Sequence, residues 1–356
     1  MIKKAYEGSI DYMQILDEKG NIDQQLMPKD LDDRKAVEMY KYMSFQRALD
    51  AKVLSLQRQG RADTYAPTLG QEAVDIGSAL AMGQYDLFVP NFRQHGVFLV
   101  RGLPLDTFFL YWKGYEDGSK EVAKIGGFPY IVPVATQIPH AVGAAVAQKY
   151  KGTGGAVVTY VGDGGTSEGN FYEGINFAGA MGAPVVVIIE NNGWAISEPV
   201  KRQGAAQTLV QKSIAAGIRG IQVDGNDVFA IYKAVKDAIA DSKNGPTLIE
   251  CLTYRMSMHT TADDPTKYRD DALVETWKPK DPILRLRTYL TNKGLWNDAL
   301  ENAMAADQLK KIDDGVEKAE QFAPDPKTMF ETVYSFMPQQ LQQEEDAAIA
   351  ANWWKD

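Results

Sequence analysis

The sequence predicts an α/β protein built on a doubly wound parallel sheet, with helical extensions at both ends of the chain. Apolar, strand-like runs alternate with helix-like segments from residue 156 to residue 253. This alternation is typical of a parallel sheet covered on both faces by helices. The 356 residues are 45% hydrophobic and 24% charged, a composition that favours a globular protein over a disordered chain.

The first expected elements are a polar arm and a long helix. The arm covers residues 1–35, and the helix that follows its acidic end runs to about Gln59, where Gly60 ends it. Short helices are expected in the stretch 60–135, which is rich in glycine, proline and aromatic residues. A helix of small residues is expected over 138–150.

The centre of the chain reads as alternating strands and helices. In order, the sequence predicts a strand at 156–161, a helix at 167–181, a strand at 185–190, a helix at 205–216, a strand at 220–223, a helix at 228–240 and a strand at 247–253. Charged helical segments are expected over 281–318. We therefore expect one α/β domain over residues 36–330 and an acidic C-terminal tail over 331–356.

Net charge and composition limit the classes of partner and the cellular location that we expect for this protein. The chain has 38 Lys and Arg against 47 Asp and Glu, a net charge of -9, which argues against nucleic-acid and anionic-membrane binding. The one cysteine, Cys251, fits a reducing compartment. The first residues lack the apolar core of a signal peptide, and the longest apolar run, Val185–Ile189, is far below the ~20 residues of a membrane helix. We expect a soluble, cytoplasmic protein.

Polar residues follow two neighbouring predicted strands. Gly162, Asp163 and Gly164 come after the first strand, and Asn191 and Asn192 come after the second. A right-handed crossover brings the carboxyl ends of both strands to one edge of the sheet, where doubly wound proteins bind their ligands. Asp163 and Asn192 are therefore expected to face one site.

The residue types at this edge predict a metal-bridged diphosphate. Carboxylate, amide and backbone oxygens suit magnesium or calcium, and two side chains leave room for phosphate and water ligands. Gly164 and Gly165 allow the backbone to approach a phosphate, and the N-terminus of the next helix adds N–H donors. A lone Gly-Asp-Gly or Asn-Asn is usually only a turn. Neither a dinucleotide-binding fingerprint nor a P-loop occurs in the sequence.

Gly-Asp-Gly after one strand and Asn-Asn after the next resembles the thiamine-diphosphate signature. Further segments are similar to the alpha chains of the decarboxylating component of 2-oxo acid dehydrogenase complexes, namely RQGRADTYAPTLGQEA (58–73), VPNFRQHG (89–96) and GPTLIECLTYRMSMHTTADDPTKYR (245–269). Within this family the chain resembles the pyruvate-specific members of Gram-positive type bacteria. The resemblance implies the thiamine-diphosphate-binding fold and the cofactors thiamine diphosphate and Mg²⁺.

The resemblance also implies roles for individual residues. It makes Asp163, the side chain of Asn192 and the carbonyl of Trp194 the magnesium ligands. Cofactor contacts are implied for Phe92, Arg93, Val132, Val134, Gly164, Gly165 and His259. Phe92 stands where many relatives have tyrosine.

The three histidines of the chain differ in what they imply. His259 aligns with the active-site loop histidine of the family, which implies a catalytic role at the diphosphate or at the reacting intermediate during reductive acylation. For His95, a catalytic and a structural role both stay open. His140 is expected to be a structural or interface residue.

The sequence holds one diphosphate signature and no second α/β half to bind the pyrimidine ring. In the family a beta chain supplies that half with its catalytic glutamate, so the resemblance implies two alpha and two beta chains and a lipoyl acyltransferase component as partners. The implied activity is oxidative decarboxylation of pyruvate with reductive acetylation of a lipoyl group. Branched-chain 2-oxo acids and acetoin stay open as alternative substrates, as does a magnesium-binding assembly subunit without activity.

Overall fold

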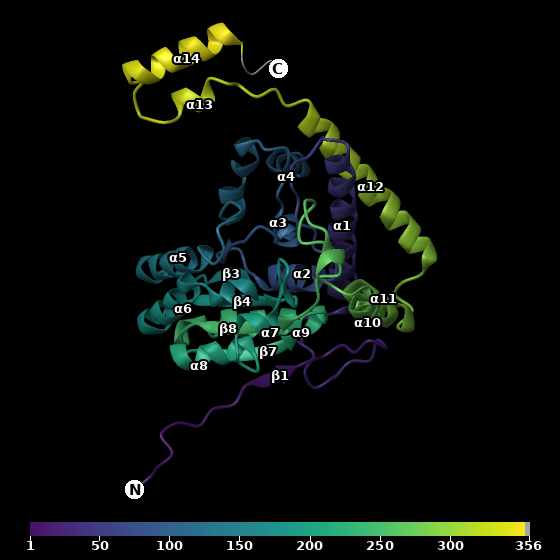
Figure 1. Ribbon diagram of the computed structural model, residues 1–356. Helices are drawn as coiled ribbons and strands as arrows, with labels where there is room; N and C mark the ends of the chain where they lie inside the picture. Colours follow the sequence, from purple (N-terminus) through teal and green to yellow (C-terminus); the bar gives the residue numbers. More distant parts are fainter. Residues whose placement is uncertain (353–356) are drawn as a thin grey trace.

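The computed structural model describes residues 1–352 and confirms the α/β class (Figure 1). Within these residues, six parallel strands form one sheet in the order β1-β7-β8-β4-β3-β2, and two short strands form a separate antiparallel hairpin. The strands of the sheet are β1 (Asp11–Met13), β2 (Leu87–Val89), β3 (Val157–Gly162), β4 (Val185–Asn191), β7 (Arg219–Asp224) and β8 (Thr247–Leu252). The hairpin consists of β5 (Trp194–Ala195) and β6 (Glu198–Pro199).

Helices surround the sheet and extend beyond it. They are α1 (Asp33–Arg58), α2 (Glu72–Ala81), α3 (His95–Arg101), α4 (Leu105–Trp112), α5 (Gln137–Lys151), α6 (Gly169–Met181), α7 (Val200–Gln203), α8 (Lys212–Ala216), α9 (Val228–Ala240), α10 (Asp271–Trp277), α11 (Pro282–Asn292), α12 (Asp298–Glu320), α13 (Thr328–Glu331) and α14 (Gln339–Ala351). The long helices α1 and α12 lie side by side at one end of the sheet (Figure 1).

The sheet is buried on both faces because its central strands carry apolar side chains in both directions. In β4, Val186 and Ile188 pack into one core with α1, α2 and α9. Val185, Val187 and Ile189 pack into a second core with α5 and α6. This two-sided burial is the physical reason for the continuous apolar runs in the sequence.

The N-terminal arm adds an edge strand that the sequence did not predict. β1 pairs in parallel with β7, although its residues Asp-Tyr-Met carry no strand-like pattern. The buried carboxylate of Asp227 accepts the N–H groups of Ile15 and Leu16 at 2.5 and 2.7 Å. The Arg285 guanidinium donates to the Leu16 carbonyl at 3.0 Å. Asp227 lies 212 positions from Ile15, so no local pattern reveals this strand.

The predicted helix at 205–216 is wrong in its first half. The chain is irregular over 204–208, and Thr208 then begins a single 3-10 turn, Leu209–Gln211, that leads into α8. Thr208 and Gln211 form a capping box, which fixes the helix start at this point. Residues 205–207 are exposed, and helix propensity without packing does not hold so short a helix.

The C-terminal tail 331–356 contains a helix that the sequence did not predict, because α14 forms within it, and α13 ends at its first residue, Glu331. Figure 1 shows these helices beyond the end of α12 and apart from the sheet. The last four residues of the predicted tail 331–356 lie outside the described residues. Across residues 1–352, none of the helices combines the length and the apolar character that crossing a bilayer requires.

Candidate active site

A cavity of about 360 Å³ opens at the carboxyl edge of β3 and β4. Its lining includes every residue that the sequence singled out for a cofactor, metal or catalytic role, namely Phe92, Arg93, Val132, Val134, Asp163, Gly164, Gly165, Asn192, Trp194 and His259. These residues come from segments far apart in the sequence, and the strand order of the sheet brings them together.

Asp163 and Asn192 face the cavity because of the strand register. β3 and β4 pair in parallel with Gly162 opposite Glu190, so the residues after each strand emerge at the same edge. The neighbouring Asn191 turns away, and its amide donates to the buried carboxylate of Glu250 at 2.8 Å. Of the Asn-Asn pair, Asn192 therefore lines the cavity.

The carboxylate of Asp163 is buried, with the residue 2% exposed, and the side chain that bonds to it, Gln203, is uncharged. Oδ2 of Asp163 accepts a hydrogen bond from the amide of Gln203 at 2.8 Å. Burial raises the pKa of the Asp163 carboxyl to about 6, because surroundings of low polarity disfavour the ionised form. A cation at this oxygen would favour ionisation, so the site fits a metal. Within residues 1–352 no cluster of three or more acidic, His or Cys side chains is placed to hold one, which leaves amide, carbonyl, phosphate and water oxygens as further ligands.

The turn after Asp163 requires glycine for steric reasons. A Cβ on Gly164 would lie 2.5 Å from the Cβ of Ala195, and a Cβ on Gly165 would lie 2.4 Å from Cγ2 of Val161. Both distances are far below van der Waals contact. The backbone of this turn therefore lines the cavity directly and leads into the N-terminus of α6, an arrangement that suits an anion.

Two buried arginines stand at the cavity: Arg93 is among its lining residues, and Arg255 bonds to the carbonyls of the lining residues Trp194 and Ile196. Arg93 donates to the Pro67 carbonyl at 2.6 Å and to the His259 carbonyl at 3.1 Å. Burial and the nearby Arg255 guanidinium lower the pKa of Arg93 to about 10. Burial also lowers the pKa of Arg255, although Tyr268 and the Asp263 carboxylate oppose the shift. Two desolvated cations beside one cavity fit an anionic ligand such as a diphosphate.

His259 is neutral and its tautomer is fixed by these arginines. Its Nδ1 lies 3.2 Å from Nη2 of Arg93 and 3.4 Å from Nη1 of Arg255. Guanidinium groups can only donate, so Nδ1 accepts and the proton is on Nε2. Burial, together with the positive charges of Arg93 and Arg255, lowers the pKa of His259 to about 3. The backbone N–H of His259 donates to Asp263 at 2.7 Å, which orders the loop.

The β5–β6 hairpin carries the Trp194 carbonyl and is strained. Ile196 in its turn has φ +53°, a conformation that glycine or asparagine usually adopts and that a β-branched residue rarely does. Arg255 donates to the Trp194 carbonyl at 3.2 Å and to the Ile196 carbonyl at 2.6 Å. The guanidinium of Arg255 thus holds this wall of the cavity in place.

Sequence reasoning missed several residues that shape the site. Arg255 gave a signal, because it follows β8 at the same sheet edge as Asp163 and Asn192. Glu190 in β4 lines the cavity, and burial raises its pKa to about 7. Gln71 and Gln203, which bond to Asn192 and Asp163, gave no signal in the sequence.

The other two histidines lie away from the cavity lining. His95 is fully buried behind the wall, with Nε2 2.8 Å from the Ala66 carbonyl and Nδ1 2.9 Å from the Tyr130 hydroxyl. This geometry favours the structural interpretation of His95. His140 is exposed at the start of α5.

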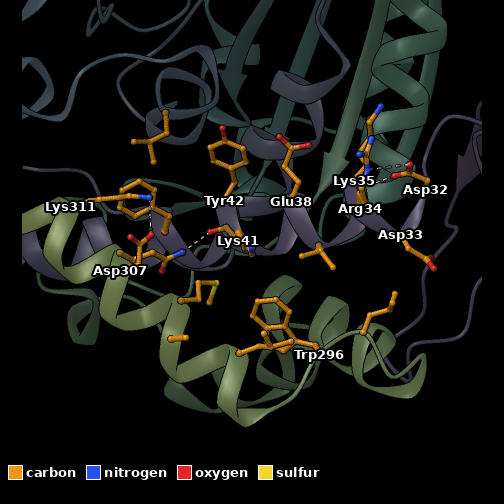
Figure 2. Close-up of a pocket in the computed structure, with 18 of the residues that line it drawn as sticks. Asp32, Asp33, Arg34, Lys35, Glu38, Lys41, Tyr42, Trp296, Asp307 and Lys311 are labelled. Carbon is orange, nitrogen blue, oxygen red and sulfur yellow. Dashed lines mark hydrogen bonds and ion pairs between the residues drawn. The ribbon is translucent and has the colours of Figure 1, made fainter.

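A hollow larger than the candidate active site lies elsewhere in the described residues. It is a groove between α1 and α12 with a volume of about 1270 Å³. Figure 2 shows Tyr42 and Trp296 among its lining residues, together with charged side chains such as Lys41 and Asp307. Basic residues such as Lys41 and Lys311 alternate there with acidic ones such as Glu38 and Asp307. None of the predicted site residues lines this groove. Because acidic and basic side chains both line it, its charge does not indicate an anionic or a cationic ligand.

We expect the imidazole of His259 to stay neutral from pH 5 to 8 in the cofactor-free protein, because its pKa is held at about 3. Pyrophosphate with Mg²⁺ would place negative charge beside the ring, so the pKa of His259 is expected to rise on binding. Histidine NMR resonances followed against pH measure this change.

The matched control for this prediction is His95. Burial lowers its pKa to about 3 as well, but it does not line the cavity, so its resonance should not respond to pyrophosphate. An unchanged pKa of His259 at saturating pyrophosphate would show that this ring does not face the anion.

Known proteins match this chain over almost its whole length. The dehydrogenase E1 component family matches residues 40–327. The chain is 42% identical over 339 residues to the pyruvate dehydrogenase E1 component subunit alpha of Staphylococcus aureus (strain Mu50 / ATCC 700699), covering 94% of this chain and 92% of that protein. It is 41% identical to the proteins of the same name from Bacillus cereus, with 95% and 92% covered, and Bacillus subtilis (strain 168), with 93% and 90% covered.

Proposed function

The chain belongs to the dehydrogenase E1 component family, and from this premise we propose that it is the alpha subunit of a thiamine-diphosphate-dependent pyruvate dehydrogenase. With a beta subunit it decarboxylates pyruvate and acetylates a lipoyl group of an acyltransferase component, in the cytoplasm. One observation carries the proposal. The buried carboxylate of Asp163 and the buried guanidinium of Arg93 line one cavity, where Asp163 bonds to the Gln203 amide and Arg93 donates to carbonyl oxygens, an arrangement that suits a metal diphosphate.

The metal end of the site is assigned to the residues after β3 and β4. Asp163 supplies a charged oxygen, Asn192 an amide oxygen and Trp194 a backbone carbonyl to Mg²⁺. These are hard oxygen ligands, and their small number leaves positions for phosphate oxygens and water. The hydrogen bond from Arg255 to the Trp194 carbonyl occupies one of its two lone pairs.

The phosphate end is assigned to the glycine turn and the cationic wall. Gly164 and Gly165 admit the diphosphate against the backbone, and Arg93 pairs with it. With Nδ1 accepting from the arginines, Nε2–H of His259 would be the donor available to the cofactor or substrate, and we assign His259 as the catalytic residue of this chain. When bound, thiamine diphosphate supplies a thiazolium carbon that adds to the 2-oxo group and a ring that accepts electrons as carbon dioxide leaves.

Phe92 fits the same wall without a hydroxyl. Its ring meets the His259 ring edge to face, with centroids 5.8 Å apart, and lies 5.3 Å from the Arg93 guanidinium carbon. Phe92 therefore restrains both side chains by packing. It cannot donate the hydrogen bond that a tyrosine would supply at this position.

The mouth of the cavity supports a partner chain. Val132, Val134 and Ile196 are 58%, 51% and 57% exposed there, which is unusual for three large apolar side chains around one opening. A beta subunit seated on this rim would bury them and would complete the pyrimidine side of the site. In this proposal, two alpha and two beta chains assemble, and residues 36–330 of each alpha chain form the diphosphate-side domain, between the arm 1–35 and the tail 331–356.

A substrate panel tests the proposed activity. The alpha and beta chains, combined and supplied with Mg²⁺ and thiamine diphosphate, are expected to turn over pyruvate with a kcat/KM at least about tenfold above that for branched-chain 2-oxo acids or acetoin, a discrimination within reach of small-pocket selectivity. Decarboxylation with an artificial electron acceptor measures it. A preference for branched-chain 2-oxo acids or for acetoin would show that pyruvate is not the main substrate. No turnover of any of them would support an assembly role without activity.

A further inference from the structure

We propose that Gln71 and Gln203 are positioning residues that hold Asn192 and Asp163 so that each presents an oxygen to the metal. The inference rests on the magnesium site proposed above and extends it to two side chains outside the ligand set. The two glutamines act with opposite hydrogen-bond polarity, and this difference makes the inference testable.

At Asn192, a backbone N–H determines the orientation of two side-chain amides, those of Asn192 and Gln71. The Trp194 N–H donates to Oδ1 of Asn192 at 3.2 Å, which fixes the oxygen on the side of Trp194, and both residues line the cavity. The other end of the amide, Nδ2, donates to Oε1 of Gln71 at 2.9 Å. Turning the Asn192 amide over would set two donors against each other at Trp194. Gln71 therefore has to act as an acceptor.

At Asp163, the polarity is reversed. Nε2 of Gln203 donates to Oδ2 of Asp163 at 2.8 Å and to the Glu198 carbonyl at 3.1 Å. A carboxylate and a carbonyl can only accept, so the amide nitrogen of Gln203 has to face both. This contact engages Oδ2 of Asp163 and restrains the carboxylate, and we assign Oδ1 to the cation.

Each glutamine leaves half of its amide unsatisfied. Nε2 of Gln71 and Oε1 of Gln203 are buried and have no hydrogen-bond partner among residues 1–352. An unpaired buried polar atom is costly, and an apolar side chain of similar size would avoid that cost. The hydrogen bonds to Asn192 and Asp163 give the physical reason for polar side chains at both positions. Outer partners of this kind orient metal ligands and commonly change metal affinity when they are removed.

The test is a calorimetric titration of Mg²⁺ into the assembled alpha–beta protein at saturating thiamine diphosphate. Methionine keeps the length of glutamine but makes no such hydrogen bonds. Gln71→Met and Gln203→Met are each expected to raise the Kd for Mg²⁺ about tenfold or more. Gln308→Met is the matched control, because Gln308 is also buried and donates to the Lys41 carbonyl at 2.9 Å, between α12 and α1. Its Kd should not change.

A second substitution separates polarity from packing. Gln71→Glu keeps an acceptor for Nδ2 of Asn192 in either protonation state, so its Kd for Mg²⁺ is expected to stay within about threefold of the parent value, below the loss usual for a missing outer partner. If Gln71→Met does not fold, Gln71→Asn takes its place, since the shorter amide cannot reach Asn192. An equal loss in Gln71→Glu and Gln71→Met would overturn the polarity argument.

Asp163→Asn distinguishes failure of this inference from failure of the proposed function. If Asp163→Asn loses Mg²⁺ affinity while both methionine variants retain it, the metal site stands and the positioning role is wrong. If Asp163→Asn binds Mg²⁺ as the parent does, the metal lies elsewhere and the proposed function loses its support. A loss in Gln308→Met comparable to the other two would also overturn the inference, because the effect would not depend on contact with a ligand.

Discussion

Replacing Asp163 by alanine is expected to abolish Mg²⁺-dependent binding of thiamine diphosphate, with a loss of at least about 100-fold in affinity, or about 3 kcal/mol. Asp163 is the charged member of the proposed ligand set, and its carboxylate is buried at the carboxyl edge of β3. Calorimetry on the assembled alpha–beta protein, with and without Mg²⁺, measures this loss. Tight Mg²⁺-dependent binding by the variant would contradict the metal assignment.

The same substitution should not weaken the metal-free fold. Burial raises the folded-state pKa of Asp163 from 3.8 to about 6, so between these values the folded state binds more protons than the unfolded state. Stability therefore falls as the pH rises through this window, and at pH 7 the ionised group costs about 3 kcal/mol. Without metal, Asp163→Ala is expected to unfold at a denaturant concentration equal to or above that of the parent. Addition of Mg²⁺ and cofactor should raise the stability of the parent protein but not that of Asp163→Ala.

The purified chain without its partner is expected to be catalytically silent. It carries the diphosphate side of the proposed site, and the exposed apolar side chains of Val132, Val134 and Ile196 form the rim on which the proposed beta subunit would sit. A ligand held at one end must still meet an association cost of ~4–15 kcal/mol. Cofactor binding by this chain alone should therefore be weak. Titrating beta chain into a fixed amount of this chain should raise the rate of pyruvate decarboxylation from zero to a plateau at equal amounts.

Two controls accompany this titration. Beta chain alone establishes the background rate, and Val134→Glu places a charge on the rim that a seated partner would have to bury, so more beta chain should be needed to reach the plateau. Full turnover by the alpha chain before any beta chain is added would contradict the two-chain proposal.

Local pattern was enough to predict much of the fold. The apolar runs that form β3 and β4 can be recognised in the sequence because both faces of these strands are buried. The acidic start and the glycine after α1 bound that helix within about two residues of the prediction. β1 and β2, which the sequence did not predict, depend on pairing with distant strands. Asp227, for example, accepts the N–H groups of Ile15 and Leu16. The error at 205–208 has a local cause, because the Thr208–Gln211 capping box fixes where the helical turn begins.

The candidate site divides in the same way. Asp163 and Asn192 were placed at one edge from sequence alone, because parallel strands joined by a helix must end on the same side. Sequence could not supply the role of Gln71, which bonds to Asn192 from 121 positions away. It also could not supply the contacts of Arg93 and Arg255 with Nδ1 of His259, which fix its tautomer.

The sequence by itself thus determined which residue types stand at the ends of the strands, since strand periodicity and short turns are local properties. Only the tertiary structure decided how their side chains are oriented and charged. Hydrogen bonds between distant segments form only once the helices have packed around the sheet. The same packing causes the burial that raises the pKa of Asp163 and lowers the pKa of His259.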